Sequence, residues 1–109
     1  MKQFYTVVLD RMTTCSDTLA SEPYETGWAD EALVFVRIHE IEKGAILQGK
    51  VQVSVDGITW VDEGTVFSPM EKVGDYFVKV KEFGGWLRLV LEPNAEKNYK
   101  VTTYLVLKG

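Results

Sequence analysis

The chain has 109 residues, of which 46% are hydrophobic and 26% are charged, which suits one domain with a core and is too little for two. Its net charge of −4 and pI of about 5.0 disfavour binding to a nucleic-acid backbone. No apolar run approaches the roughly 20 residues of a membrane helix, and Asp10 and Arg11 end the N-terminal apolar run too early for a signal peptide. We therefore expect a single domain over residues 1–109 with no nucleic-acid partner, no membrane partner and no signal peptide.

Cys15 is the only cysteine of the chain. One cysteine forms neither an internal disulfide nor a four-ligand zinc site, so we expect the fold to depend on neither. This cysteine usage is typical of a reducing cytoplasm, or of an assembly made inside a cell, rather than of a small secreted scaffold.

The first third of the chain predicts two long strands. Lys2–Asp10 is the first, and the polar connection at 11–31 includes a short edge strand at Asp17–Ser21. Ala32–Glu40 is the second long strand. One of its two alternating rows is apolar throughout, and the opposite row begins with apolar residues as well, which predicts cover on both faces for part of this strand.

The centre of the chain predicts a β-hairpin. Alternate residues from Ala45 to Val55 are apolar or small while those between them are polar, the period of a strand with one buried face. Asp56-Gly57 suits a two-residue type I′ turn. Ile58–Val61 then returns antiparallel, and Trp60 is expected in the core.

The last third predicts three further strands after a short one at Thr65–Phe67. Tyr76–Glu82 and Trp86–Glu92 are expected to pair about a turn at Phe83-Gly84-Gly85, and Tyr99–Lys108 closes the chain. In all, seven or eight strands recur at roughly ten-residue spacing without a helical period. This pattern predicts an all-β fold, an antiparallel β-sandwich or jelly roll.

The segment from Ser54 through Asp56 and Gly57 to Trp60 reads S-x-D-G-x-x-W and resembles the hairpin of discoidin-like (galactose-binding-like) jelly rolls. The run Trp86-Leu87-Arg88-Leu89 is similar to a later strand of those domains. The same hairpin also resembles that of small β-sandwich proteins of tailed bacteriophages and their prophages. The size of the chain, its start at Met1 without a leader and its final strand are similar to theirs. Neither resemblance transfers a ligand site.

No catalytic arrangement is evident in the sequence. His39 is the only histidine, so a Ser-His-Asp or Cys-His arrangement would have to use it. We expect it on a solvated strand face, in a structural role. Cys15 has no basic neighbour closer than Arg11 to activate it. We therefore expect no enzyme activity, no metal and no cofactor. Carboxylates that can in principle form a glycosidase pair or bind calcium occur mostly where turns collect them, at Asp30, Glu31, Glu40, Glu42, Asp56, Asp62 and Glu63.

Several apolar and aromatic residues lie in rows opposite the expected core rows. An apolar second face marks a protein–protein contact, unless residues 11–31 cover it. An outward Trp86 beside Arg88 also suits the stacking of a sugar ring. The interface candidates are Leu33, Phe35, Trp86, Arg88, Val90, Tyr104 and Val106.

These observations favour a non-enzymatic structural or assembly protein, such as a capsid decoration or accessory protein of a phage virion. Its expected partners are other protein subunits, either its own copies or a capsid or tail protein, and its expected location is the virion or the cytoplasm. The alternative is a carbohydrate-binding module of discoidin-like type that uses an outward aromatic side chain.

Overall fold

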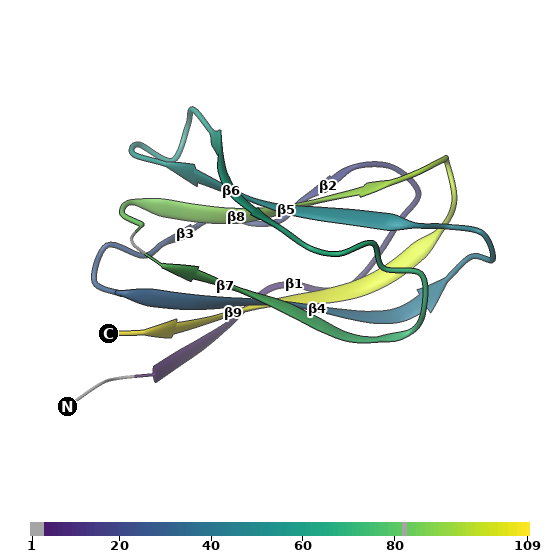
Figure 1. The fold of residues 1–109 in the computed structure, drawn as a ribbon, viewed down its shortest axis with the longest axis horizontal. Helices are drawn as coiled ribbons and strands as arrows, with labels where there is room; N and C mark the ends of the chain where they lie inside the picture. The colour runs from purple at the N-terminus through teal and green to yellow at the C-terminus, as the bar shows by residue number, and fades with distance from the viewer. Residues whose placement is uncertain (1–3, 82) are drawn as a thin grey trace.

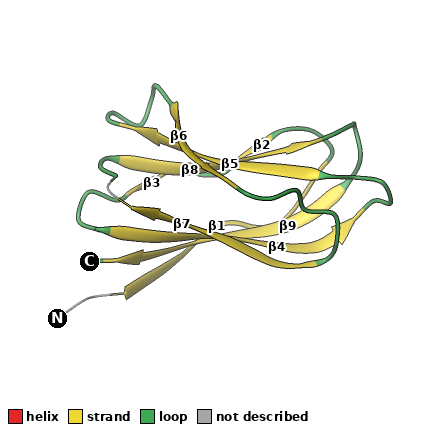
Figure 2. Cartoon of the chain, in the orientation of Figure 1, coloured by secondary structure: helices red, strands yellow, loops and turns green. Residues whose placement is uncertain are grey.

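Two antiparallel β-sheets lie face to face, and the chain passes between them repeatedly (Figure 1). The computed structural model describes residues 4–81 and 83–109, and this part contains strands but no helix (Figure 2). Lys2, Gln3 and Glu82, which were expected in strands, lie outside the described residues. The strands are β1 (Phe4–Cys15), β2 (Leu19–Ala20), β3 (Tyr24–Glu25), β4 (Glu31–Ile41), β5 (Leu47–Ser54), β6 (Val61–Val66), β7 (Gly74–Lys81), β8 (Trp86–Pro93) and β9 (Tyr99–Lys108).

The strand order is that of a jelly roll. One sheet has the order β1-β9-β4-β7 and the other has the order β2-β8-β5-β6, with β3 also pairing with β8. Among the described strands, β5 and β6 are the only sequence neighbours that pair with each other, so most connections cross from one sheet to the other. The predicted antiparallel β-sandwich or jelly roll is confirmed. The expected edge strand at 17–21 is present as the short β2.

The core lies between the sheets and is made by the alternating rows that the sequence indicates. On β4 the inner row runs from Ala32 to Ile38, and on β8 it consists of Leu87, Leu89 and Leu91. β9 contributes an inner row of its own, and all these side chains are buried. Because a strand places successive side chains on opposite faces, each inner row leaves an outer row on the far side of its sheet.

The predicted pairing of the strands on either side of Phe83-Gly84-Gly85 is wrong. β7 pairs with β4, while β8 pairs with β5 in the other sheet. The glycine-rich connection therefore spans the two sheets instead of closing a hairpin. Gly85 has φ +81°, and a Cβ atom there would clash with the carbonyl oxygen of Ser54. A short glycine-rich connection suits a tight hairpin and a tight sheet-to-sheet passage alike, so the local signal does not distinguish them.

The predicted type I′ turn at Asp56-Gly57 is also wrong, because the β5–β6 connection is a wider loop at 55–60. Gly57 has φ +78°, but Asp56 does not have the positive φ that this turn requires. Side chains close the loop instead. The Ser54 Oγ accepts a hydrogen bond from the Gly57 N–H at 2.9 Å. The Asp56 Oδ1 accepts hydrogen bonds from the N–H groups of the next residues, at 58 and 59.

The wider loop ends the alternation of β5 earlier than predicted. Val55, expected in the buried row, is 92% exposed, while Ser54, expected to face water, is buried. Trp60 is only half-buried and lies outside the core, which corrects its predicted position. Both changes follow from the hydrogen-bonded loop, which leaves the sheet after Ser54.

Gly49 allows an aromatic ring to approach β5. Phe67 is buried and follows the end of β6, where its N–H donates to the Gly49 carbonyl oxygen at 2.8 Å. A Cβ atom at position 49 would lie 2.8 Å from Phe67 Cδ1 and 3.3 Å from Leu91 Cδ2. A side chain at this strand position therefore competes directly with the Phe67 ring.

We expect Gly49→Ala to lower the free energy of unfolding by about 1–3 kcal/mol, since the added methyl group overpacks the core. Urea denaturation followed by tryptophan fluorescence measures the change. Gly84→Ala is the matched control, because no heavy atom lies within 4 Å of a Cβ there. Equal midpoints for the two variants would contradict this account of the Phe67 contact.

Candidate interaction surface

The structure divides the predicted interface residues between two opposite faces of the sandwich. Leu33, Phe35, Tyr104 and Val106 lie on the outer face of the sheet β1-β9-β4-β7. The other three, Trp86, Arg88 and Val90, lie in the outer row of β8 in the second sheet. The seven residues therefore do not form one patch.

On the first face the cross-strand register brings apolar side chains together. Phe35 lies opposite Tyr104 on one side and Phe77 on the other, and Leu33 lies opposite Val106. The Phe35 and Phe77 rings stack with their centroids 5.3 Å apart and an interplanar angle of 24°. Phe77 is 54% exposed. We call this surface the outer patch; its residues are Val8, Leu33, Phe35, Phe77, Tyr104 and Val106.

Val8 and Phe77 were missing from the predicted set. Their signal was present in the sequence, since Phe77 alternates with the inward Tyr76 and Val78. The sequence did not show, however, that β7 and β1 flank β4 and β9 on the same face. Sequence-distant pairing decides which outward residues become neighbours.

The connection after β1 does not cover the outer patch. It is shorter than the predicted 11–31, because β1 continues to Cys15 and β4 begins at Glu31. Its two short strands, β2 and β3, both pair with β8 and so belong to the other sheet (Figure 1). The outer patch thus remains a partly exposed apolar surface of the described chain.

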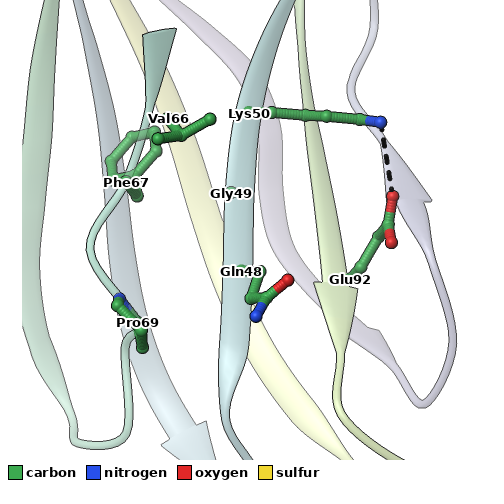
Figure 3. A pocket seen from close by; sticks show the side chains of 7 residues that line it. All are labelled: Gln48, Gly49, Lys50, Val66, Phe67, Pro69 and Glu92. Atoms are coloured by element: carbon green, nitrogen blue, oxygen red, sulfur yellow. Dashed lines mark ion pairs between the residues drawn. The ribbon is translucent and has the colours of Figure 1, made fainter.

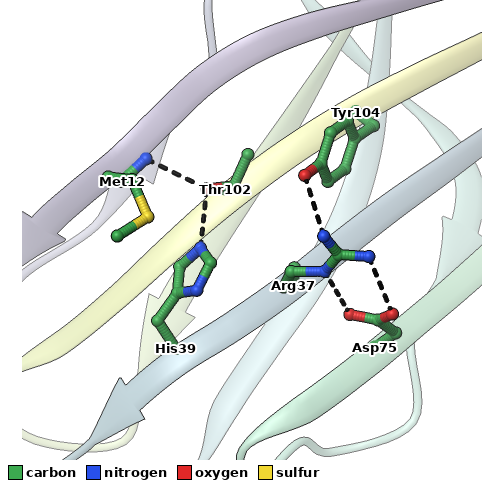
Figure 4. Close-up of polar contacts among 6 residues, drawn as sticks. All are labelled: Met12, Arg37, His39, Asp75, Thr102 and Tyr104. Carbon is green, nitrogen blue, oxygen red and sulfur yellow. Dashed lines mark hydrogen bonds and ion pairs between the residues drawn. The ribbon is translucent and has the colours of Figure 1, made fainter.

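A bidentate ion pair borders the outer patch (Figure 4). Arg37 donates from Nε and Nη2 to the two carboxylate oxygens of Asp75, at 2.8 and 3.1 Å. The same guanidinium lies 5.5 Å from the centroid of the Tyr104 ring and donates to its hydroxyl at 3.3 Å. These hydrogen bonds, with the attraction between the opposite charges, raise the pKa of Arg37 and lower that of Asp75.

His39 lies near the same end of this face, where its ring contacts a threonine hydroxyl. Its Nε2 lies 2.7 Å from the hydroxyl oxygen of Thr102, a buried residue of β9. That hydroxyl also accepts a hydrogen bond from the Met12 N–H at 3.0 Å (Figure 4). Met12 lies in a bulge of β1 and has φ 48°. The threonine hydroxyl thus links the histidine to the irregular backbone of β1.

Several hollows lie on the surface, two of them beside residues of the outer patch or of β5. One, of about 290 Å³, lies against the outer patch and is lined by residues that include Phe35, Arg37 and Tyr104. The other, of about 370 Å³, lies between β5 and the segment after β6 (Figure 3). Its one cation, Lys50, is already within 3.7 Å of the Glu92 carboxylate and 3.5 Å of the Asp62 carboxylate. The second hollow therefore offers no free charge to an anionic ligand.

The outer face of the second sheet is closed by polar and aromatic contacts. The guanidinium of Arg88 lies 4.5 Å from the centroid of the Trp60 ring, a cation–π contact, and its Nε donates to Gln52 Oε1 at 2.8 Å. Trp86 lies under the hairpin loop, because a Cβ atom on Gly57 would lie 3.1 Å from its Cε2. Arg88 therefore stacks on Trp60 rather than presenting an open pair with Trp86. Val90 is buried.

The described part of the chain has neither a cluster of metal-ligating side chains nor a membrane-spanning helix. No group of three His, Cys, Asp or Glu side chains is close enough there to hold a metal ion. Residues 4–81 and 83–109 contain no helix long and apolar enough to cross a membrane.

The fold and the outer patch define a small jelly-roll protein with one partly apolar sheet face. No protein-family model and no curated protein matches the chain. Among solved structures it is similar to the SPBc2 prophage-derived protein YomS, with a TM-score of 0.63 and 11% identity over 100% of this chain and 96% of that one.

The chain is also similar to part of a protein in the structures of two infectious bursal disease virus strains, Gx and Gt. Both have a TM-score of 0.62, with 7% and 8% identity, over 98% of this chain. The chain spans 32% of the length of each viral chain. Identities this low show a shared fold.

We expect the pKa of Asp75 to lie below its ordinary value of 3.8 and to rise toward it in Arg37→Gln, which removes the neighbouring cation. Because its pKa is lowered in the folded state, the ionised Asp75 carboxylate stabilises the fold at pH values above its ordinary pKa. This contribution disappears as the pH falls through the lowered pKa. Side-chain carboxyl NMR measures both titrations.

Asp56 is the internal control for this titration. Hydrogen bonds from the backbone N–H groups of Thr59 and Ile58 lower its pKa, and Arg37 has no part in them. Its titration should be the same in both proteins. An unchanged Asp75 titration in Arg37→Gln would show that the ion pair does not form in solution.

Proposed function

We propose that the protein is a non-enzymatic structural or assembly protein of a phage-like particle and acts through protein–protein contacts made by the outer patch. The observation that carries this proposal is the outer patch itself, where apolar and aromatic side chains from four strands adjoin on one sheet face. An antiparallel sheet that faces only water alternates between apolar and polar residues. This sheet carries apolar residues on both faces.

The composition of the face supports a protein partner. Its apolar centre is bordered by the Arg37–Asp75 pair at one end, and the Lys79 and Lys108 side chains lie in neighbouring positions of the register. An apolar centre with a charged rim is the usual layout of an interface. Its partners would be its own copies or a capsid or tail protein.

The assignment to a particle is supported by the similarity to a prophage-derived protein and to part of a viral chain. Jelly rolls serve in viral capsids, but also in lectins and cupins, so fold likeness alone does not determine function. Within the proposal, the chain is a capsid decoration or accessory protein located in the virion.

A non-enzymatic role is supported by the surroundings of the two side chains best suited to nucleophilic chemistry. The Cys15 thiol donates to the Asp17 carbonyl oxygen at 3.3 Å. The His39 ring is engaged by Thr102. Carbohydrate binding has weaker support than protein binding, because Trp86 lies under the hairpin loop and Arg88 is engaged by Trp60 and Gln52.

Density-gradient fractionation of the native source tests the proposal. We expect the wild-type chain to co-purify with particles, and the double variant Tyr104→Ser with Val106→Ser to remain at the top of the gradient, since it removes apolar area from the centre of the outer patch. Thermal melting verifies that the variant is folded.

The matched control is Val55→Ser with Ile58→Ser, which removes two side chains that are 92% and 80% exposed on the β5–β6 loop. This control should co-purify as the wild type does. A wild-type chain that is absent from particle fractions contradicts the proposed role. A particle-bound Tyr104→Ser, Val106→Ser variant contradicts the use of the outer patch.

A further inference from the structure

The edges of the two sheets differ in how well they could accept another strand. An edge strand exposes unpaired backbone groups, which proteins commonly protect by bulges, shortness or side-chain contacts. β1 has two register shifts and the positive φ of Met12, and β2 has only two residues. β6 has a register shift, and its Thr65 N–H is occupied by the Glu63 carboxylate at 3.0 Å.

β7 is the regular edge. Its eight residues pair with β4 from Lys81 to Gly74 without a register shift, and its opposite side pairs with no other strand of the described chain. Its outer row includes Asp75, Phe77 and Lys79, all exposed. A second strand can therefore extend this sheet without first removing a bulge or a blocking side chain.

We propose that a second copy of this chain pairs antiparallel along β7, about a two-fold axis at Phe77, so that the two four-stranded sheets form one continuous sheet. This inference names one partner for the protein contacts proposed above and rests on that proposal only for placing the contact on this sheet. A two-fold interface uses the same residues from both copies, so the strand has to be complementary to itself.

The charge pattern of β7 meets this requirement. Asp75 lies two residues before Phe77 and Lys79 lies two residues after it. In the antiparallel arrangement each Asp75 therefore faces Lys79 of the second copy. Lys79 has no ion-pair partner among the described residues, and 55% of the Asp75 side chain remains exposed beside Arg37. The arrangement thus forms two symmetric cross-strand ion pairs.

The aromatic residues support the same register. At the axis the two Phe77 rings face each other, and each already stacks on Phe35 of its own chain. An aromatic pair directly across two strands is a stabilising contact. A lysine on an edge strand normally discourages pairing. In the register centred on Phe77, each Lys79 is instead neutralised by the facing Asp75. A register centred on Tyr76 would place Asp75 opposite Phe77 and lose this ion pair, so the charges favour the register centred on Phe77.

Charge reversal tests the inference by sedimentation velocity of the full-length chain. The wild type should show a concentration-dependent dimer. Lys79→Glu alone should be monomeric, because each new carboxylate faces Asp75 of the other copy, and Asp75→Lys alone should be monomeric because lysines then face each other. An equimolar mixture of the two variants should form a heterodimer, in which every facing pair again has opposite charges. The matched control, Lys43→Glu, changes the same charge in the exposed β4–β5 turn and should leave the dimer intact.

A wild type that is monomeric at every concentration overturns the inference, and so does a dimer that persists in Lys79→Glu. A mixture that remains monomeric overturns the proposed register. These outcomes are separate from the proposed function, which is tested on β9. A monomeric chain that still co-purifies with particles overturns the dimer and supports the particle role. A dimeric chain that is absent from particles supports the dimer and overturns the particle role.

Discussion

The mutual burial of the inner faces of the two sheets is the constraint on which the rest of the structure depends. Each sheet hides one face against the other, and side chains such as Val36, Leu89 and Leu105 fill the space between them. Burial of this apolar surface is the main favourable contribution to folding. Because the strands alternate, the same constraint leaves two outer faces that the core does not need. What those faces contain is therefore the better guide to function.

The two outer faces have contrasting chemistry. On the sheet that contains β5 and β8, Arg88 stacks on Trp60 and donates a hydrogen bond to Gln52. The Gln52 amide nitrogen in turn donates to the Asp62 carboxylate at 3.0 Å. That face satisfies its own polar groups. On the sheet that contains β4 and β9, polar contacts gather around Arg37 and leave an apolar centre beside it. This asymmetry is why the proposed contacts are assigned to one sheet.

The sequence predicted β4, β5, β8 and β9 well, because their period of two comes directly from burial of one face. It was wrong about β6, since it placed two short strands at 58–61 and 65–67 where the structure has one strand at Val61–Val66. It did not predict which strands pair, since in a jelly roll most partners are distant in sequence. Phe83-Gly84-Gly85 looked like a hairpin turn for this reason, and Trp86 was grouped with Tyr104 although they belong to different sheets. The interface prediction therefore named outward residues of both sheets. It missed Phe77, which becomes a neighbour of Phe35 only through the β4–β7 pairing.

Hydroxyl-radical footprinting of the chain, as the dilute monomer and in particles, tests the central claim most directly, because it reports the solvent access of single side chains. The account predicts that Phe77 and Tyr104 become protected in the particle, while Trp28, which is 45% exposed and lies on the connection at 16–30, keeps its reactivity. Unchanged labelling of Phe77 and Tyr104, together with new protection of Trp60 on the opposite sheet, would contradict the account.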